Sequence, residues 1–251
     1  MAIPIALQLY SVREDCAKDL PGTLKAVAKM GYAGVEFAGY YNYSPKDLRK
    51  MLDDNGLKCA GTHTPLASVM GSQLAPTIEF NQALGNRFLI VPWLDERYRV
   101  DEHAWTVLAH AFNDIAGRCG KSGMYVGYHN HSFEFQPLKD APALPWDLFF
   151  GNTVREVVMQ FDTGNALHGG AHAATFLQRY PGRALTVHLK ECSATNKNAL
   201  VGEGDVQWAE IFKLCETIAG TQWYIVEQET YAHPPLECAR LCLEKLRAMG
   251  K

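Results

Sequence analysis

The chain has 251 residues, of which 47% are hydrophobic and 20% charged, and a globular chain of this size buries a large core without disulfide staples. A formal net charge of −3 predicts no basic face for nucleic acid, and no apolar run approaches the ~20 residues of a membrane span. The seven cysteines are scattered and include no C-x-x-C pair, which predicts reduced thiols. The N-terminus has no basic signal-peptide region, and together these features predict a cytoplasmic location.

Short apolar runs alternate with amphipathic stretches along the whole chain. The apolar runs predict strands over residues 5–10, 34–38, 58–63, 88–93, 124–131, 157–162, 184–190 and 223–228. The amphipathic stretches predict helices over residues 20–30, 45–55, 77–84, 102–119, 145–150, 171–180, 206–219 and 236–249. Local signals mark the ends: Gly31 stops the first helix, and Ser44 followed by Pro45 supplies the cap and first turn of the second.

The regular alternation of strands with helices predicts a parallel sheet, because each helix returns the chain to the same edge. Eight such units fit a closed (β/α)8 TIM barrel, with residues 1–251 as a single domain. An open doubly wound sheet would show a Gly-rich fingerprint after its first strand. Residues 8–13, Gln-Leu-Tyr-Ser-Val-Arg, contain no glycine, so the closed barrel is favoured.

Polar side chains gather where the predicted strands end, which is the edge that carries TIM-barrel active sites. The fifth to eighth units carry, in order, Glu134, Asp162, His188 and Glu227. Three carboxylates would repel one another without a cation between them, and a neutral imidazole is a further metal ligand. The set predicts one divalent ion, because mixed oxygen and nitrogen ligands without a thiolate suit Mn²⁺, Mg²⁺, Co²⁺ or Zn²⁺.

Each of these residues also has an ordinary structural explanation. Asp162 precedes Thr-Gly-Asn and could cap a turn, and His188 could be a hydrogen-bonded core histidine. Glu227 could pair with Lys190 or with an arginine. Glu36 on the second strand is interpreted mainly as a buried carboxylate with a cationic or hydrogen-bonding partner. The structural explanations lose force jointly, because they would have to hold on four successive strands.

Six short stretches follow one another in an order typical of one family. They are residues 8–13 (QLYSVR), 34–40 (GVEFAGY), 128–135 (YHNHSFEF), 187–190 (VHLK), 201–208 (VGEGDVQW) and 224–228 (YIVEQ). Together they resemble the sugar phosphate isomerase/epimerase family, whose fold is a xylose isomerase-like TIM barrel. The match runs along nearly the whole chain, but it is weak for the substrate because the family includes epimerases, ketol isomerases, dehydratases and related lyases.

The resemblance implies one divalent metal, with Mn²⁺ as the first candidate, held by Glu134, Asp162, His188 and Glu227. His129 or His131 could take the place of Glu134. The resemblance also implies that Glu134 and Glu227 are the catalytic proton-transfer pair. The metal would bind a carbonyl oxygen and a neighbouring hydroxyl of a keto-sugar and stabilise an enediolate. Return of the proton to the other face or the next carbon would make the protein a sugar isomerase or epimerase.

Six further residues are expected around the sugar substrate: Tyr10, His63, Trp93, His129, His131 and Lys190. The histidines would contact hydroxyl groups or provide an alternative base. Lys190 would polarise an oxygen or offset the carboxylates. The two aromatic residues would form apolar walls for the ring, or they pack in the core.

Three other functions remain open at this point. A metal-dependent lyase or dehydratase acting on a keto-sugar or cyclitol shares every step up to the elimination. An endonuclease for abasic DNA shares the barrel, but it would use several metals and a basic surface. A sugar-binding protein with an inactive site would lack one of the ligands. No Gly-rich cradle or arginine cluster indicates a phosphorylated substrate, and a homo-oligomer is compatible with the sequence.

Overall fold

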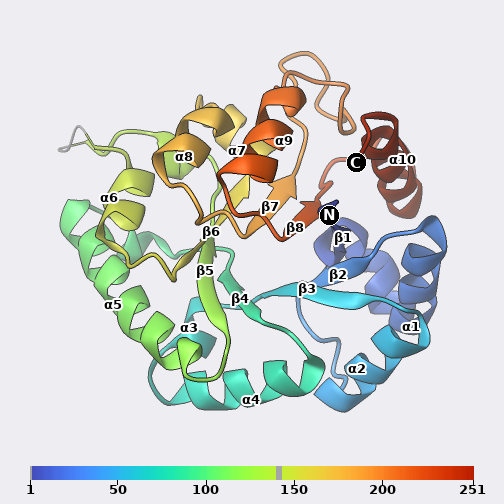
Figure 1. Cartoon of the computed structure of the whole chain (residues 1–251), viewed down its shortest axis with the longest axis horizontal. Helices are drawn as coiled ribbons and strands as arrows, with labels where there is room; N and C mark the ends of the chain where they lie inside the picture. The colour runs from blue at the N-terminus through green and yellow to red at the C-terminus, as the bar shows by residue number, and fades with distance from the viewer. Residues whose placement is uncertain (1, 140–142) are drawn as a thin grey trace.

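Strand β1 pairs with β2 on one side and with β8 on the other, so that the sheet of parallel strands closes on itself. This computed structural model describes residues 2–139 and 143–251. The strands are β1 Ile5–Gln8, β2 Gly34–Phe37, β3 Lys58–His63, β4 Phe88–Val91, β5 Tyr125–His129, β6 Val158–Asp162, β7 Thr186–Leu189 and β8 Trp223–Val226. The closed parallel barrel confirms the predicted (β/α)8 fold, and Figure 1 shows the helices placed around the central strands.

The helices connect successive strands on the outside of the barrel. They are α1 Arg13–Met30, α2 Pro45–Asp54, α3 Leu66–Val69, α4 Leu74–Leu84, α5 Glu102–Gly120, α6 Pro145–Asn152, α7 Thr163–His168, α8 Ala173–Arg179, α9 Trp208–Thr217 and α10 Pro235–Ala248. Short 3-10 turns occupy Leu9–Val12 (η1), Gly71–Gln73 (η2), Glu96–Tyr98 (η3) and Phe133–Phe135 (η4). The expected cap is present at α2, where the Ser44 hydroxyl accepts from the Asp47 N–H at 3.2 Å.

Three helices differ clearly from the sequence prediction. The first is α3, a four-residue helix in a part of the chain where only a helix over residues 77–84 is predicted. Helix α1 begins at Arg13 rather than at residue 20, because two helical segments meet at a kink. The backbone at Asp19 is extended there (φ −155°), and Pro21 begins the second segment. Helix α7 was not predicted at all, since it is only six residues long and follows β6 without a loop. The acceptor that starts α7 is the side chain of Asp162, as the turn-cap explanation of that residue anticipated.

The inside of the barrel changes from apolar to polar along the strands. Ala6, Ala60 and Ile225 form one small apolar cluster inside it, and Phe88, Ile90 and Val158 form another. Closer to the carboxyl ends of the strands, the buried side chains are Gln8, Glu36, Gln160 and His188. The main apolar core lies instead between the sheet and the helices. Among residues 2–139 and 143–251, buried polar groups therefore meet inside the barrel at the carboxyl ends of the strands.

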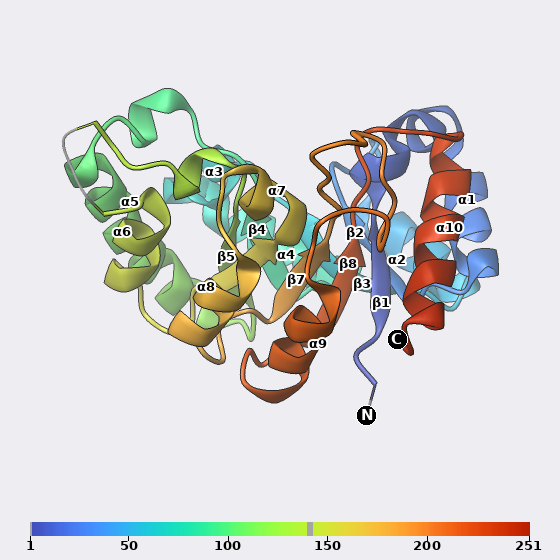
Figure 2. The same ribbon diagram turned by 90° about the horizontal axis from the view of Figure 1, so that it is seen from above.

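Helix α10 closes the ring of helices by packing against α1, and Figures 1 and 2 both show these two helices side by side. The hydroxyl of Tyr32, just after α1, donates to the carbonyl of Ala239 in α10 at 2.7 Å. Within the described residues, no helix combines the length and the apolar character needed to cross a membrane.

Candidate metal centre and substrate cavity

Four buried side chains from consecutive strands converge at the carboxyl end of the barrel. His129 ends β5, Asp162 ends β6, His188 lies within β7 and Glu227 directly follows β8. The strand register places Asp162 directly beside His188. One potential ligand atom from each of the four lies within 4.8 Å of those of the other three. We call these four residues the metal group.

The distances within the metal group leave one carboxylate oxygen unpaired. The Nδ1 atom of His188 lies 2.6 Å from Glu227 Oε2 and 3.9 Å from Asp162 Oδ2. The Nε2 atom of His129 lies 4.0 Å from the same oxygen of Asp162. Asp162 Oδ1 accepts from the Asn165 N–H at 2.7 Å, but Oδ2 is buried and has no hydrogen-bond partner in the described part of the chain.

A buried carboxylate oxygen without a donor is costly unless a cation neutralises it. Two imidazoles and two carboxylates are ligands suited to a divalent metal of the first transition row. The donor set and the unpaired Oδ2 of Asp162 therefore fit a single divalent ion.

The charges of the metal group depend strongly on burial. Burial raises the pKa of Asp162 to about 7 and holds the pKa of His129 well below its usual value. Burial alone would raise the pKa of Glu227, but the charges of Lys190 and His188 hold it well below the usual range. His188 faces the opposite effect: despite its burial, Glu36 and Glu227 raise its pKa to about 10. The proton on His188 offsets the nearby carboxylate charges. A bound cation would replace that proton, because metal binding releases protons from the ligands.

Glu36 lies beneath the metal group and orients His188. Its fully buried carboxylate accepts from His188 Nε2 at 2.6 Å, from Gln8 Nε2 at 2.6 Å and from Gln160 Nε2 at 2.8 Å. The expectation that Glu36 is a buried carboxylate with such partners is confirmed. Burial would raise its pKa, but the neighbouring His63 and His188 lower it. Because the Glu36 carboxylate accepts a hydrogen bond from Nε2–H of His188, the Nδ1 atom is left to face the metal group.

Gln160 plays the same part for His129, and the sequence analysis assigned it no role. Its Oε1 accepts from His129 Nδ1 at 3.2 Å and from His63 Nε2 at 2.8 Å. Its amide donates to Glu36 and to the hydroxyl of Thr186. This contact directs the free Nε2 of His129 towards Asp162. The signal in the sequence was a glutamine within an otherwise apolar strand, where a buried amide needs several partners.

Glu134, expected as the strand-five ligand, lies away from the metal group. Its carboxylate accepts from the Tyr128 hydroxyl at 2.5 Å and from the His131 N–H at 2.8 Å. Tyr128 precedes His129 and so points to the opposite side of β5, where its ring packs against Trp105 of α5. Burial in this layer raises the pKa of Glu134 to about 7. The structure thus brings His129, and not Glu134, together with Asp162, His188 and Glu227.

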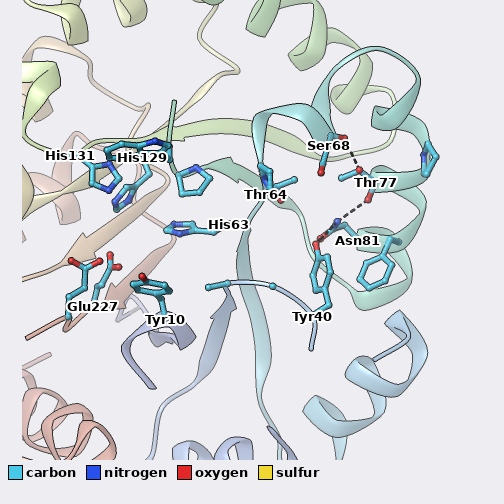
Figure 3. Close-up of a pocket in the computed structure, with 18 residues that line it drawn as sticks. Tyr10, Tyr40, His63, Thr64, Ser68, Thr77, Asn81, His129, His131 and Glu227 are labelled. Atoms are coloured by element: carbon cyan, nitrogen blue, oxygen red, sulfur yellow. Dashed lines mark hydrogen bonds between the residues drawn. The ribbon is translucent and has the colours of Figure 1, made fainter. Parts of the chain in front are cut away.

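A cavity of about 780 Å³ opens beside the metal group. Five of the six residues expected around the substrate line it: Tyr10, His63, Trp93, His129 and His131. Glu227 lines it as well, and Figure 3 shows Tyr10, His63, His129, His131 and Glu227 facing one end. Lys190 is absent from the described lining residues, since its ammonium group pairs with Glu229 at 2.7 Å.

His131 and Trp93 form one wall of this end. Their rings meet edge to face, with centroids 4.7 Å apart. Burial lowers the pKa of His131 to about 4, so its imidazole is neutral at physiological pH. Its Nδ1 atom is buried and has no partner among residues 2–139 and 143–251. His131 is thus available to hydrogen-bond a molecule in the cavity.

The loop between β7 and α9 is organised by the carboxylate of Glu191. Its Oε1 accepts from the N–H groups of Cys192 (3.0 Å) and Val206 (3.2 Å). Its Oε2 accepts from the Gly202 N–H (2.7 Å) and from the indole N–H of Trp208 (2.9 Å). One side chain therefore holds both ends of the loop beside Lys190.

The closed parallel barrel agrees with a comparison to known protein families. A family model described as xylose isomerase-like TIM barrel matches residues 24–249. The chain therefore belongs to the xylose isomerase-like TIM barrel family.

Three proteins illustrate what the chain is similar to. The inosose dehydratase of Clostridium beijerinckii is 23% identical, covering 82% of this chain and 81% of that protein. The inosose dehydratase of Geobacillus kaustophilus is 24% identical and covers 86% of each. A solved structure of a sugar phosphate isomerase/epimerase from Parabacteroides distasonis is 26% identical with a TM-score of 0.84, covering 99% of this chain and 95% of that one.

Proposed function

We propose that the protein is a metal-dependent lyase that removes water from a keto-cyclitol or a keto-sugar. The observation that carries the proposal is the buried metal group, with its unpaired Asp162 oxygen, beside a cavity that admits such a ring. The relatives named inosose dehydratase support this reaction class over the isomerase expected from the sequence.

In this proposal His129, Asp162, His188 and Glu227 hold one divalent ion, with Mn²⁺ as the first candidate. His129 replaces Glu134 as the ligand from the fifth unit. When bound, the ion would polarise the carbonyl oxygen of the substrate and acidify the neighbouring C–H bond. The low pKa of His129 supports its role, because only a neutral imidazole binds a metal.

Glu227 is the base in this scheme. Its carboxylate lines the cavity and stays ionised at neutral pH, because Lys190 and His188 hold its pKa low. Glu227 takes the proton from the carbon beside the carbonyl, and the C–O bond at the next carbon breaks with its electron pair on oxygen. The departing hydroxide takes the proton that Glu227 removed from carbon, so that one water is lost and Glu227 is ionised again, while the neutral imidazole of His131 can hydrogen-bond the departing oxygen.

A sugar epimerase or isomerase is the second candidate. The 26% identity to the sugar phosphate isomerase/epimerase structure favours it. Proton transfer between two faces of a substrate needs an acid–base group on each face. Of the two glutamates expected to share that task, Glu227 lines the cavity whereas Glu134 is engaged by Tyr128 outside the barrel. This arrangement supports elimination more than epimerisation.

The test is product analysis with protein loaded with Mn²⁺ in D2O. A panel of inososes and keto-hexoses is incubated with the protein and followed by mass spectrometry. A lyase gives a product lighter than its substrate by one water. An isomerase gives a product of unchanged skeleton that has gained deuterium. Metal binding without either change would point to a sugar-binding protein. Cleavage of abasic duplex DNA at ~0.15 M salt would point to an endonuclease. Either result would overturn the proposal.

A further inference from the structure

The cavity is much larger than the ring that the metal group would hold. A six-carbon ring with its oxygens fills about six water volumes, on the order of 200 Å³. The cavity holds about 780 Å³. Figure 3 shows where the extra space lies: His129, His131 and Glu227 face one end, while Tyr40, Ser68, Thr77 and Asn81 face the other.

The far end is built from the loops after β2 and β3 and from α3 and α4. We call it the apolar arm and define it by the lining residues Ala38, Tyr40, Pro65, Ser68, Pro76 and Phe80. The rings of Tyr40 and Phe80 pack with centroids 4.3 Å apart and an angle of 34° between their planes. Their exposed faces offer a surface suited to another flat apolar group.

Several of the polar groups along the apolar arm are already paired with one another. The Thr77 hydroxyl donates to the Ser68 carbonyl at 2.7 Å, and the Asn81 amide donates to the Tyr40 hydroxyl at 3.1 Å. Neither lysine nor arginine occurs among the described residues that line the cavity. An anionic group such as a phosphate would therefore find no cation here, whereas an uncharged apolar group would find a surface that it can desolvate at little cost.

We propose that the substrate is an unphosphorylated keto-sugar or keto-cyclitol that carries an aromatic substituent, and that the apolar arm binds this substituent. The inference rests on the proposed function for the ring at the metal group. It adds that recognition extends across the barrel mouth to the loops of the first half. Continuity of the two ends within one cavity supports a single ligand that spans both.

The test compares two probes that differ only in the substituent. Phenyl and methyl β-D-glucopyranoside lack a keto group, so they report binding alone when titrated calorimetrically into Mn²⁺-loaded protein. The phenyl probe is expected to bind about tenfold more tightly, because its ring buries apolar area in the arm. A ratio of the two dissociation constants near one would overturn the proposal.

Two neighbouring residues of α3 provide a matched pair of variants. Ser68 lines the arm, whereas Ala67 is exposed on the same helix and is not part of the cavity lining. Ser68→Leu fills the arm and is expected to bring the phenyl-to-methyl ratio close to one, while Ala67→Leu keeps the ratio of the unaltered protein. Phe80→Ala, which removes one of the paired rings, is expected to reduce the ratio as well and provides a second variant should Ser68→Leu not fold. An unchanged ratio in folded Ser68→Leu or in Phe80→Ala would contradict the proposal.

The binding test separates this inference from the proposed function. Water loss from unsubstituted rings together with a ratio near one would overturn the apolar arm alone. A clear phenyl preference without any turnover of keto compounds would overturn the lyase assignment and leave the arm standing.

Discussion

The two halves of the barrel mouth differ in what they contribute to the cavity. Strands β5 to β8 each place one ionisable side chain of the metal group directly at a strand end. On the other side, the surface comes from loops and short helices after β2 and β3, and it is mainly apolar. Two polar residues of that half, Glu36 and His63, point inward and meet His188 and Gln160.

Under the proposed function, this difference separates chemistry from recognition. Residues on strands are held by the sheet register, which keeps ligand atoms within tenths of an ångström of their places. Residues on loops can change without disturbing the sheet. A family built this way can keep one metal group while the loops of the opposite half select different substrates.

The largest expected effect is loss of the metal group through Asp162→Asn. Asparagine keeps an oxygen that can cap α7 but replaces the unpaired Oδ2 with an amide that binds no cation. We expect turnover to fall by at least about 10³-fold, and metal content measured by atomic emission to fall with it. Asp114→Asn, on the exposed face of α5, is the control. Full metal content and turnover in Asp162→Asn would remove this residue from the site.

A second variant, Glu134→Gln, tests whether Glu134 lies outside the metal group. The glutamate pKa is about 7 in the folded protein against 4.5 when unperturbed, so the folded state holds its proton more strongly. Protonated Glu134 therefore stabilises the folded state. This contribution is fully present below pH 4.5 and is lost as pH rises through 7, and it is worth roughly 3 kcal/mol in the free energy of unfolding. Glutamine does not titrate, so denaturant unfolding should show the variant gaining stability relative to the original protein as pH rises from 4.5 to 7.5.

The metal content of Glu134→Gln is an independent test of whether Glu134 is a metal ligand. We expect it to equal that of the original protein, because the carboxylate is engaged by Tyr128 and the His131 backbone. Loss of metal would restore Glu134 as the ligand and displace His129.

The smallest expected effect comes from Glu36→Gln, which links the two halves. The variant weakens the hydrogen bond that fixes His188 Nε2 and should lower Mn²⁺ affinity by about 10- to 100-fold. Because Glu36 is fully buried and is not among the described residues that line the cavity, turnover should return at saturating Mn²⁺. A titration of activity against Mn²⁺ concentration measures both quantities, and failure to recover at high Mn²⁺ would mean that Glu36 does more than orient His188.

The sequence allowed the fold to be predicted because its signals were local. Gly31, Ser44 and Pro45 marked helix ends that the structure confirms, and the third strand has the predicted bounds, Lys58–His63. Helix α7 is not predicted, because six residues are too few to show a helical period. The closed barrel then followed from the number and order of the units.

The site was harder to predict where a residue lay beyond a strand. Within a strand, alternation tells which residues share a face, and this places His129 opposite Tyr128. Glu134 lies five residues past the end of β5, in the 3-10 turn η4, where no alternation shows its direction. The apolar arm was invisible for a similar reason: its residues come from separate loops, and only the tertiary structure brings Tyr40 and Phe80 together.

The carboxylate of Glu191 also bears on how this protein could change over time. Residues 193–205 form no helix or strand, so their backbone groups need partners from elsewhere. The Glu191 carboxylate accepts from Gly202 within the segment and from Cys192, Val206 and Trp208 at its ends. The side chains of Ser193, Asn196, Glu203 and Asp205 accept from further N–H groups of the segment. The shape of the segment therefore depends on these five polar side chains, and the rim beside β7 can acquire new side chains at the remaining positions while the five are kept.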